Sequence, residues 1–352
     1  MHGGNIYDEK IAYDFSVNVN PLGVLPKVRQ AMEEALEDVS CYPQVESKNL
    51  RRELAQALEV REECLLLGNG ASELFAAVFH ALHPKKILLP APGFSGYTWA
   101  ARMTETEICR YPMKPEKGFT LDEEILDDLT PEIEMLVLAN PNNPTGKYID
   151  AGLLVQILNR CEELGIYVLL DECFMELSHA PQEHSLKKEY GKWKHLLIAG
   201  AFTKSFAIPG VRLGYLLGGD AEWMKKISYQ LPEWNVSLVA QRAGSACIKK
   251  WDSLTQVRAY IKSERRKLSI GLKQLEIEVL ESDANFLLIR TDLPLYEKLL
   301  ERGILIRDCS DYPGLKKGYY RIAVKKSEEN RMLLQEIACI IEEKEKNNEQ
   351  RN

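Results

Sequence analysis

The sequence has no long apolar run. Its longest apolar stretches, such as 135–139 and 166–170, have the length of strands, whereas a membrane-spanning helix needs about 20 apolar residues. The first residues, Met-His-Gly-Gly-Asn, contain no basic segment followed by an apolar one, so no signal peptide is visible. We therefore expect no membrane partner and a cytoplasmic location.

Paired cysteines and basic clusters are also missing. The eight cysteines form no C-x-x-C pair, which argues against structural zinc and disulfides. Lys and Arg number 45 against 52 Asp and Glu, a formal net charge of -7, and no basic arm could follow a nucleic-acid backbone. We expect neither a metal site nor a nucleic-acid partner.

The chain does contain an ordinary core composition, with 45% apolar and 28% charged residues among 352. From residue 64 onward, short apolar runs alternate with stretches of helical spacing, which predicts an α/β fold with a mainly parallel sheet between helices. The predicted strands are 64–67, 86–90, 135–140, 166–171, 195–200 and 213–218, and the predicted helices include 73–82 and 151–164. Gly165 is the expected C-cap of the second helix.

The pattern changes after Pro232. A charged stretch of helical spacing, 237–275, is expected to bridge two domains, and a small α+β domain follows it. The elements predicted for that domain are strands at 285–290, 304–308 and 319–324, a helix at 295–302 and a last helix from residue 328. The predicted organisation is an N-terminal arm with part of the small domain (1–35), a large domain (36–235), the interdomain helix with the small domain (236–345) and a frayed tail (346–352).

The strongest chemical signal is a lysine just past a buried-type strand. Lys204 lies between Thr203 and Ser205 among apolar residues, and Arg212 follows eight positions later. A lysine that is removed from water has a lowered pKa, and its free amine can attack a carbonyl to form a Schiff base. A solvated surface lysine is the structural alternative.

Three further segments follow predicted strands. Asp171 ends an apolar strand, where α/β sheets place their ligands. The turn 140–146, Asn-Pro-Asn-Asn-Pro-Thr-Gly, is stiff but could also carry a site residue. The turn 68–73 joins a strand to a helix, and its exposed amides suit a phosphate.

Together, in this order, these four segments resemble the fold type I pyridoxal-phosphate enzymes, specifically the class I and II aminotransferase superfamily, over nearly the whole chain. The resemblance implies a large domain with a mainly parallel seven-stranded sheet and a smaller α+β domain. It also implies pyridoxal 5'-phosphate as the cofactor, bound by Lys204 as a Schiff base. Asp171 would pair with the ring nitrogen, and Asn143 would bind the phenolic oxygen. The residues implied for the cofactor phosphate are Gly70, Ala71, Ser72, Thr203 and Arg212.

The sequence departs from this pattern at two positions. Ala201 replaces a hydroxyl residue that many members carry, and this removes one possible phosphate contact. Phe174 replaces a tyrosine, so Asn143 would have more of the task of setting the Schiff base pKa.

The ends of the chain resemble one branch of the superfamily, the L-threonine-O-3-phosphate decarboxylases, which supply aminopropanol phosphate for cobalamin biosynthesis. The matching segments are 2–5, 14–23, 234–237, 284–290, 304–315 and 319–323. The histidinol-phosphate aminotransferases share the cofactor residues and are the alternative. Since both groups act on an amino compound with a phosphate ester, phosphate recognition alone does not separate them.

An amino acid phosphate brings a carboxylate and a phosphate, which call for cations that do not titrate. The resemblance assigns Arg321 chiefly to the carboxylate, and Arg307, His2 and Asn20 to the phosphate. Tyr42 resembles a tyrosine that reaches into the partner's site, which implies a homodimer with shared active sites. A DNA-binding regulator with an aminotransferase-like domain is a third hypothesis, which the sequence disfavours because no DNA-binding module is visible.

Overall fold

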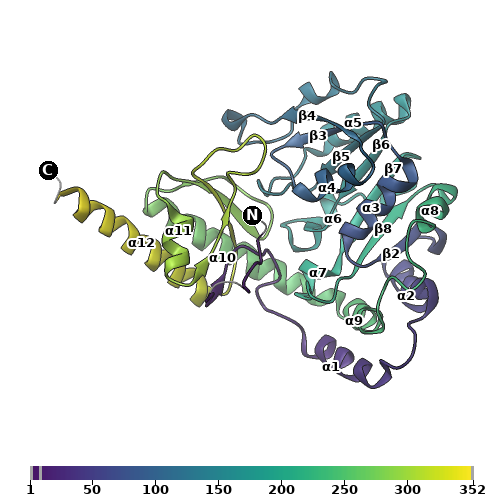
Figure 1. Ribbon diagram of the computed structural model, residues 1–352, viewed down its shortest axis with the longest axis horizontal. Coiled ribbons are helices and arrows are strands. Elements are labelled where there is room, and N and C mark those ends of the chain that lie inside the picture. Colours follow the sequence, from purple (N-terminus) through teal and green to yellow (C-terminus); the bar gives the residue numbers. More distant parts are fainter. Residues whose placement is uncertain (1–2, 8–9, 350–352) are drawn as a thin grey trace.

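The computed structural model describes residues 3–7 and 10–349. A seven-stranded sheet forms the centre of the larger part, and helices cover both of its faces (Figure 1). Its order is β2-β8-β7-β6-β5-β3-β4, and only β8 runs antiparallel to its neighbours. The strands are β2 (Leu65–Gly68), β3 (Lys86–Ala91), β4 (Glu107–Pro112), β5 (Met135–Ala139), β6 (Tyr167–Asp171), β7 (Leu196–Ala201) and β8 (Gly214–Gly218). The predicted mainly parallel α/β sheet is confirmed.

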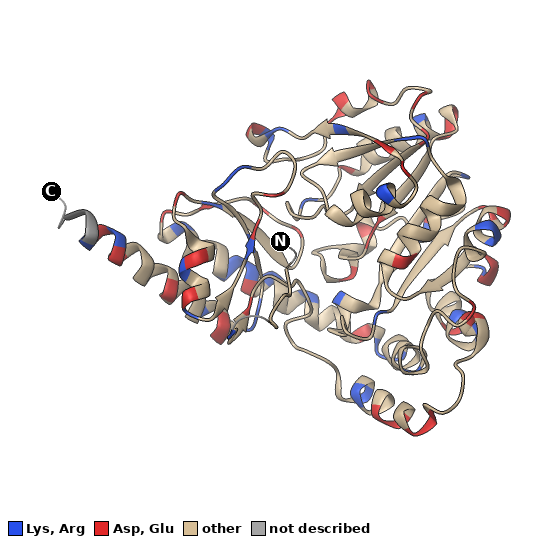
Figure 2. Cartoon of the chain, in the orientation of Figure 1, with Lys and Arg blue, Asp and Glu red and all other residues tan. Residues whose placement is uncertain are grey.

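The two faces of this sheet belong to two apolar cores. Alternate residues of a strand point to opposite faces, so Leu169 joins one core while Val168 and Leu170 join the other. The helices α3 (Ala71–Leu82), α4 (Ser95–Met103) and α8 (Ala221–Ser228) cover the Leu169 face. The helices that cover the other face are α2 (Lys48–Leu58), α5 (Ala151–Leu164) and α9 (Leu238–Ile248). Figure 2 shows the result: charged residues lie mainly on helices and connecting segments, and the large sheet is mostly uncharged.

The smaller part has its own sheet and core. An antiparallel sheet of order β12-β13-β10-β9 packs on α10 (Leu254–Gln274), α11 (Leu295–Glu301) and α12 (Ser327–Glu349). Its strands are β9 (Glu278–Val279), β10 (Phe286–Arg290), β12 (Arg307–Asp308) and β13 (Tyr319–Ala323). The helix α10 runs between the two parts, with its first turns in the core of the large part and its later turns in the core of the smaller one (Figure 1).

The N-terminal segment joins both parts. Its strand β1 (Tyr13–Asp14) pairs in parallel with β11 (Ile304–Leu305), and the Ala323 backbone N–H donates to the Phe15 carbonyl at 2.8 Å. A few residues later, the Asn20 backbone N–H donates to the carbonyl of Lys204 at 2.9 Å. The helix α1 (Pro26–Ala35) follows and packs on α9. The domain boundaries given above stay predictions.

Three local predictions differ from the structure. The stretch 237–275 is two helices, because α9 ends at Ile248 and a 3-10 turn at Trp251–Ser253 precedes α10; Trp251 turns inward to pack on Phe202 and Phe206. The single strand expected at 304–308 is divided between β11 and β12, which belong to different sheets. The helix α12 continues to Glu349, within the tail that the sequence predicts to fray.

Candidate active site

The carboxyl ends of β5, β6 and β7, which are neighbours in the sheet, bring the predicted residues together. Asn143 follows β5, Asp171 ends β6, and Lys204 lies in the single-turn helix α7 (Phe202–Ser205) after β7. All three line a cavity of about 300 Å³. The other predicted residues that line this cavity are Ala71, Ser72, Phe174, Thr203, Arg212, Arg307 and Arg321.

Lys204 lines this cavity and is partly buried, and its pKa is lowered to about 8. Burial is the largest cause, because an ammonium group loses its hydration. The positive charges of Arg321 and Arg212 lower the pKa further. At neutral to slightly basic pH, both forms of the amine are therefore populated, which suits a group that must be a nucleophile and also carry protons.

Asp171 is held by two donors from this chain. The Tyr97 hydroxyl donates to Oδ2 at 2.7 Å, and the Cys173 backbone N–H donates to Oδ1 at 2.8 Å. Burial raises the pKa of Asp171, while these hydrogen bonds and the charge of Lys204 lower it. A cation placed against this carboxylate would keep it ionised.

Tyr97 is a site residue that our sequence analysis missed. It lies in α4, which follows β3, and β3 is the next strand beyond β5 in the sheet. The turn before α4, Pro-Gly-Phe-Ser at 92–95, follows a predicted strand as the other site turns do. That position in the sequence was the signal that could have found Tyr97.

An anion site is formed where α3 begins. Gly70 has φ +80°, and a Cβ on it would lie 2.5 Å from Nη2 of Arg212, so the absence of a side chain lets that guanidinium pack against the turn. In β8, a Cβ on Gly214 would lie 2.6 Å from the Ala71 backbone nitrogen, so this glycine lets the helix start approach the sheet. The backbone amides of a 12-residue helix and the Arg212 cation thus face one end of the cavity, together with Ser72 and Thr203.

Two arginines of the small sheet also line the cavity. Arg307 and Arg321 are direct partners in the register of β12 and β13, so their side chains leave the sheet on the same face. Both are nearly buried, with 6% and 7% of their surface exposed. Two buried like charges side by side are unfavourable, and an anion bound between them would offset that repulsion.

The two guanidinium groups have different partners. Arg321 donates from Nη1 to Oδ1 of Asn143 at 2.6 Å and from Nη2 to the Ser16 carbonyl at 2.7 Å. Its Nε is buried and has no hydrogen-bond partner among the described residues. Arg307 donates from Nη2 to the Asp311 carboxylate at 2.8 and 3.0 Å and from Nη1 to the Asp308 carbonyl.

The structure places Asn20 outside the lining of the cavity. Its Nδ2 donates to the Ser205 carbonyl and its Oδ1 accepts from the Leu22 N–H, both at 2.9 Å, so both ends of the amide bind backbone groups. It does not line the cavity, and it fixes the N-terminal segment to the Lys204 turn. His2 lies outside the described residues.

Asn18, two residues before Asn20, does line the cavity, together with Ser16 and Val17 of the same segment. It is 2% exposed, and its Nδ2 and Oδ1 are both buried without a partner among the described residues. A buried amide without hydrogen bonds is unfavourable, so Asn18 is a strong candidate to contact a bound ligand. Alternation along the segment could not have separated the two asparagines, because residues two positions apart point to the same side of an extended chain.

Two aromatic residues lie in different surroundings. Phe174 lines the cavity, packs edge-on against Phe286, and has its ring centroid 5.8 Å from Nζ of Lys204. Tyr42 lies outside the cavity, is 81% exposed, and has its ring centroid 5.0 Å from that of Trp234.

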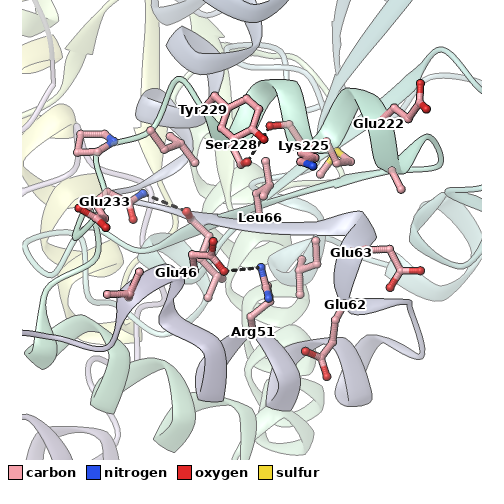
Figure 3. A pocket seen from close by; sticks show the side chains of 18 residues that line it. Glu46, Arg51, Glu62, Glu63, Leu66, Glu222, Lys225, Ser228, Tyr229 and Glu233 are labelled. Carbon is pink, nitrogen blue, oxygen red and sulfur yellow. Dashed lines mark hydrogen bonds and ion pairs between the residues drawn. The ribbon is translucent and has the colours of Figure 1, made fainter.

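A larger groove, of about 830 Å³, lies beside β2 and α8 (Figure 3). Glutamates such as Glu46 and Glu233 surround its rim, and Arg51 forms an ion pair with Glu46 at 3.7 Å. None of the predicted site residues that the structure describes lines this groove. The smaller cavity is therefore the candidate active site.

Within the described residues, no group of three or more His, Cys, Asp or Glu side chains could hold a metal ion. No described helix is both long and apolar enough to cross a membrane.

Comparison with known proteins decides the family. The profile of the aminotransferase class I and II family matches residues 10–337. The chain belongs to this family.

Two curated members are similar over almost the whole chain. Threonine-phosphate decarboxylase of Salmonella typhimurium is 33% identical, and the match covers 97% of this chain and 96% of that protein. The adenosylcobalamin biosynthesis bifunctional protein of Leptospira interrogans is 31% identical, over 96% of this chain and 41% of its own length. Among solved structures, histidinol-phosphate aminotransferase from Clostridium acetobutylicum is 28% identical with a TM-score of 0.86, and the match covers 92% and 98% of the two chains.

The pKa of Lys204 gives a first prediction. The free amine should appear with a midpoint near pH 8, because the pKa is lowered to about that value. Reductive methylation of the cofactor-free protein with formaldehyde, followed at this residue by mass spectrometry across pH, measures it. Arg321→Met should move the midpoint upward, since one positive charge is lost. A midpoint near 10.4, the ordinary lysine value, would contradict the burial argument.

Tyr97→Phe gives a second prediction. The pKa of Asp171 should rise further, because the Tyr97 hydroxyl stabilises the ionised form. Carbon-13 NMR of cofactor-free protein with labelled aspartate measures this pKa. Tyr111→Phe, which removes a tyrosine that donates to Asp122 elsewhere, is the matched control. An Asp171 that titrates as in the unmodified protein would refute the assigned role of Tyr97.

Proposed function

We propose that the chain is a pyridoxal-phosphate-dependent carboxy-lyase that converts L-threonine O-3-phosphate into (R)-1-aminopropan-2-yl phosphate and CO2. The product would serve the nucleotide loop of cobalamin. The observation that carries the proposal is the pair of buried, directly opposed arginines, Arg307 and Arg321, in one cavity with Lys204. The names of the Salmonella and Leptospira relatives support the same reading.

The residues present fit the cofactor. The Lys204 amine would bind its aldehyde, Asp171 would pair with its ring nitrogen, and Asn143 would contact its phenolic oxygen beside Phe174. The residues that would hold its phosphate are the backbone amides of Gly70, Ala71 and Ser72 with Thr203 and Arg212. When bound, pyridoxal phosphate supplies an aromatic ring that accepts the electron pair left at the substrate's Cα. The buried Asp171 fits that ring because its carboxylate needs a cationic partner.

The remaining cations would hold the substrate. Arg321 would bind the carboxylate, since its Nε is buried without a partner among the described residues and its two terminal nitrogens contact only neutral oxygens. Arg307 and Asn18 would bind the phosphate, with His2 on the same side by resemblance. A carboxylate and a phosphate at fixed points determine how the substrate lies between them.

Protein groups would then perform two tasks in the reaction. Arg321 would fix the orientation of the carboxylate, which determines whether the bond from Cα to the carboxylate carbon or the bond from Cα to hydrogen is aligned for cleavage. Lys204, with its pKa near 8, could deliver the proton that replaces CO2 at Cα. Release of CO2 would leave Arg321 without its anion, while the phosphate would remain on Arg307.

A histidinol-phosphate-type aminotransferase is the second candidate. The structural likeness to the Clostridium acetobutylicum enzyme, with a TM-score of 0.86, favours it. Such an enzyme would use the same residues, but it would cleave the bond from Cα to hydrogen and would require 2-oxoglutarate or glutamate as the second substrate.

One experiment separates the two. Protein loaded with cofactor should release CO2 from L-threonine O-3-phosphate without consuming a keto acid, whereas glutamate formed from 2-oxoglutarate and histidinol phosphate would identify an aminotransferase.

Arg307→Met or Arg321→Met should weaken the apparent affinity for L-threonine O-3-phosphate at least about thirtyfold, because truncating one member of a buried charged pair costs about 2 to 5 kcal/mol. Arg290→Met, which removes an exposed arginine of the adjacent strand, is the control. A Lys204→Ala protein that still forms a borohydride-reducible adduct would show that another amine binds the cofactor.

We also propose a cytoplasmic homodimer with shared active sites. The exposed pair of Tyr42 and Trp234 supports it, because two large aromatic residues lie together on the surface away from the cavity of their own chain. Tyr42→Ala should lower activity and weaken association. Analytical ultracentrifugation that finds a fully active monomer would contradict this proposal.

A further inference from the structure

Arg307 differs from Arg321 in having an acidic partner. The Nη2 atom of Arg307 donates to both carboxylate oxygens of Asp311, at 2.8 and 3.0 Å. In the part of the chain that the structure describes, no carboxylate lies within ion-pair distance of Arg321, whose terminal nitrogens contact an amide and a carbonyl oxygen. One arginine of the opposed pair is therefore charge-compensated and the other is not.

Asp311 reaches Arg307 from outside the candidate active site. Arg307 lines two cavities, the site of about 300 Å³ and a smaller one of about 150 Å³, and Gly3 lines both as well. Asp311 lines only the smaller of the two, and its side chain is 45% exposed. A ligand in the larger cavity could thus bind Arg307 without displacing Asp311.

The guanidinium of Arg307 is also held by groups other than Asp311. Its Nη1 donates to the Asp308 carbonyl, and its central carbon lies 4.9 Å from the centroid of the Tyr312 ring. These contacts come from the end of β12 and the turn that follows it, where the Ser310 N–H donates to the Asp308 carboxylate at 2.9 Å. Arg307 therefore keeps two restraints on its orientation when the charge of Asp311 is removed.

We propose that Asp311 weakens the binding of phosphate at Arg307, so that the product can leave. This inference depends on the proposed function, in which Arg307 holds the phosphate. The substrate and the product both carry that group, because only the carboxylate is lost in the reaction. A phosphate held by an uncompensated buried arginine would leave slowly, and a carboxylate on the far side of the guanidinium reduces the attraction through simple Coulomb repulsion.

The charge of the ligand provides a sharp test. A phosphate ester carries a charge of about -1.5 to -2 at neutral pH, whereas a sulfate ester of the same shape carries a single charge. The Coulomb energy scales with ligand charge. Removal of the Asp311 charge should therefore change the binding free energy of the phosphate ester about twice as much as that of the sulfate ester. A change in the shape of the site would instead alter both affinities by similar factors.

The experiment compares 2-aminoethyl phosphate with 2-aminoethyl sulfate, which lack the carboxylate and cannot lose CO2. Their binding to the cofactor-loaded enzyme at pH 8 is measured by calorimetry. Asp311→Asn should lower the dissociation constant of the phosphate ester about tenfold and that of the sulfate ester about threefold. With L-threonine O-3-phosphate as substrate, kcat and KM should both fall, because release of the product becomes slower. Asp311→Glu, which keeps the charge, should restore the original values.

Glu278→Gln is the matched control, since it also removes the acid of an arginine pair in the same sheet, at Arg290 on the surface. Asp311→Ser gives the same comparison if the asparagine variant does not fold. Weaker binding of both esters would overturn the proposal and make Asp311 a residue that only orients Arg307. Equal changes for the two esters, or none, would also overturn it. If Arg307→Met leaves binding of the phosphate ester unaltered, the proposed function itself is wrong at this residue.

Discussion

The removal of Lys204 from water is the constraint on which the rest of the structure depends. Its ammonium form is unfavourable in this cavity because burial removes hydration and because Arg321 and Arg212 add positive charge nearby. The fold can hold the amine there because the two cores that pack on the large sheet fix the ends of β5, β6 and β7 in position. Asp171 is the only acid among the described residues that line this cavity, so the site is cationic overall. A cavity of this kind attracts ligands that carry several negative charges.

The cations of the cavity come from both parts of the molecule. The segment that joins β7 to β8 supplies Lys204 and Arg212, while Arg307 and Arg321 come from adjacent strands of the small sheet. The hydrogen bond from Arg321 to Asn143 joins the two parts directly at the cavity. A ligand bound between these groups would contact both parts at once, so its affinity would depend on how the two parts are placed.

Much of this site was predictable because it follows a local rule. Asp171 ends an apolar strand, and Asn143 and Lys204 come shortly after two others. Parallel strands place such residues at one edge of a sheet. The features of the structure that depend on packing between distant segments were not predictable. Trp251 interrupts the expected long helix because Phe202 and Phe206 lie beneath it, and Asn18 rather than Asn20 faces the cavity because the Ser205 carbonyl takes the amide of Asn20. Tyr97 was missed because its partner, Asp171, is 74 residues away in the sequence.

The short segment from Tyr13 to Asn20 limits how this protein could be divided or recombined. It pairs with β11, accepts Arg321 on the Ser16 carbonyl, contributes Asn18 to the cavity, and is fixed to the Lys204 turn through Asn20. Neither part alone therefore contains a complete binding pocket. A chimera that exchanges one part with a relative would have to keep this segment matched to both parts that it contacts. An exchange made only at helix α10 would leave the segment paired with a part from another protein.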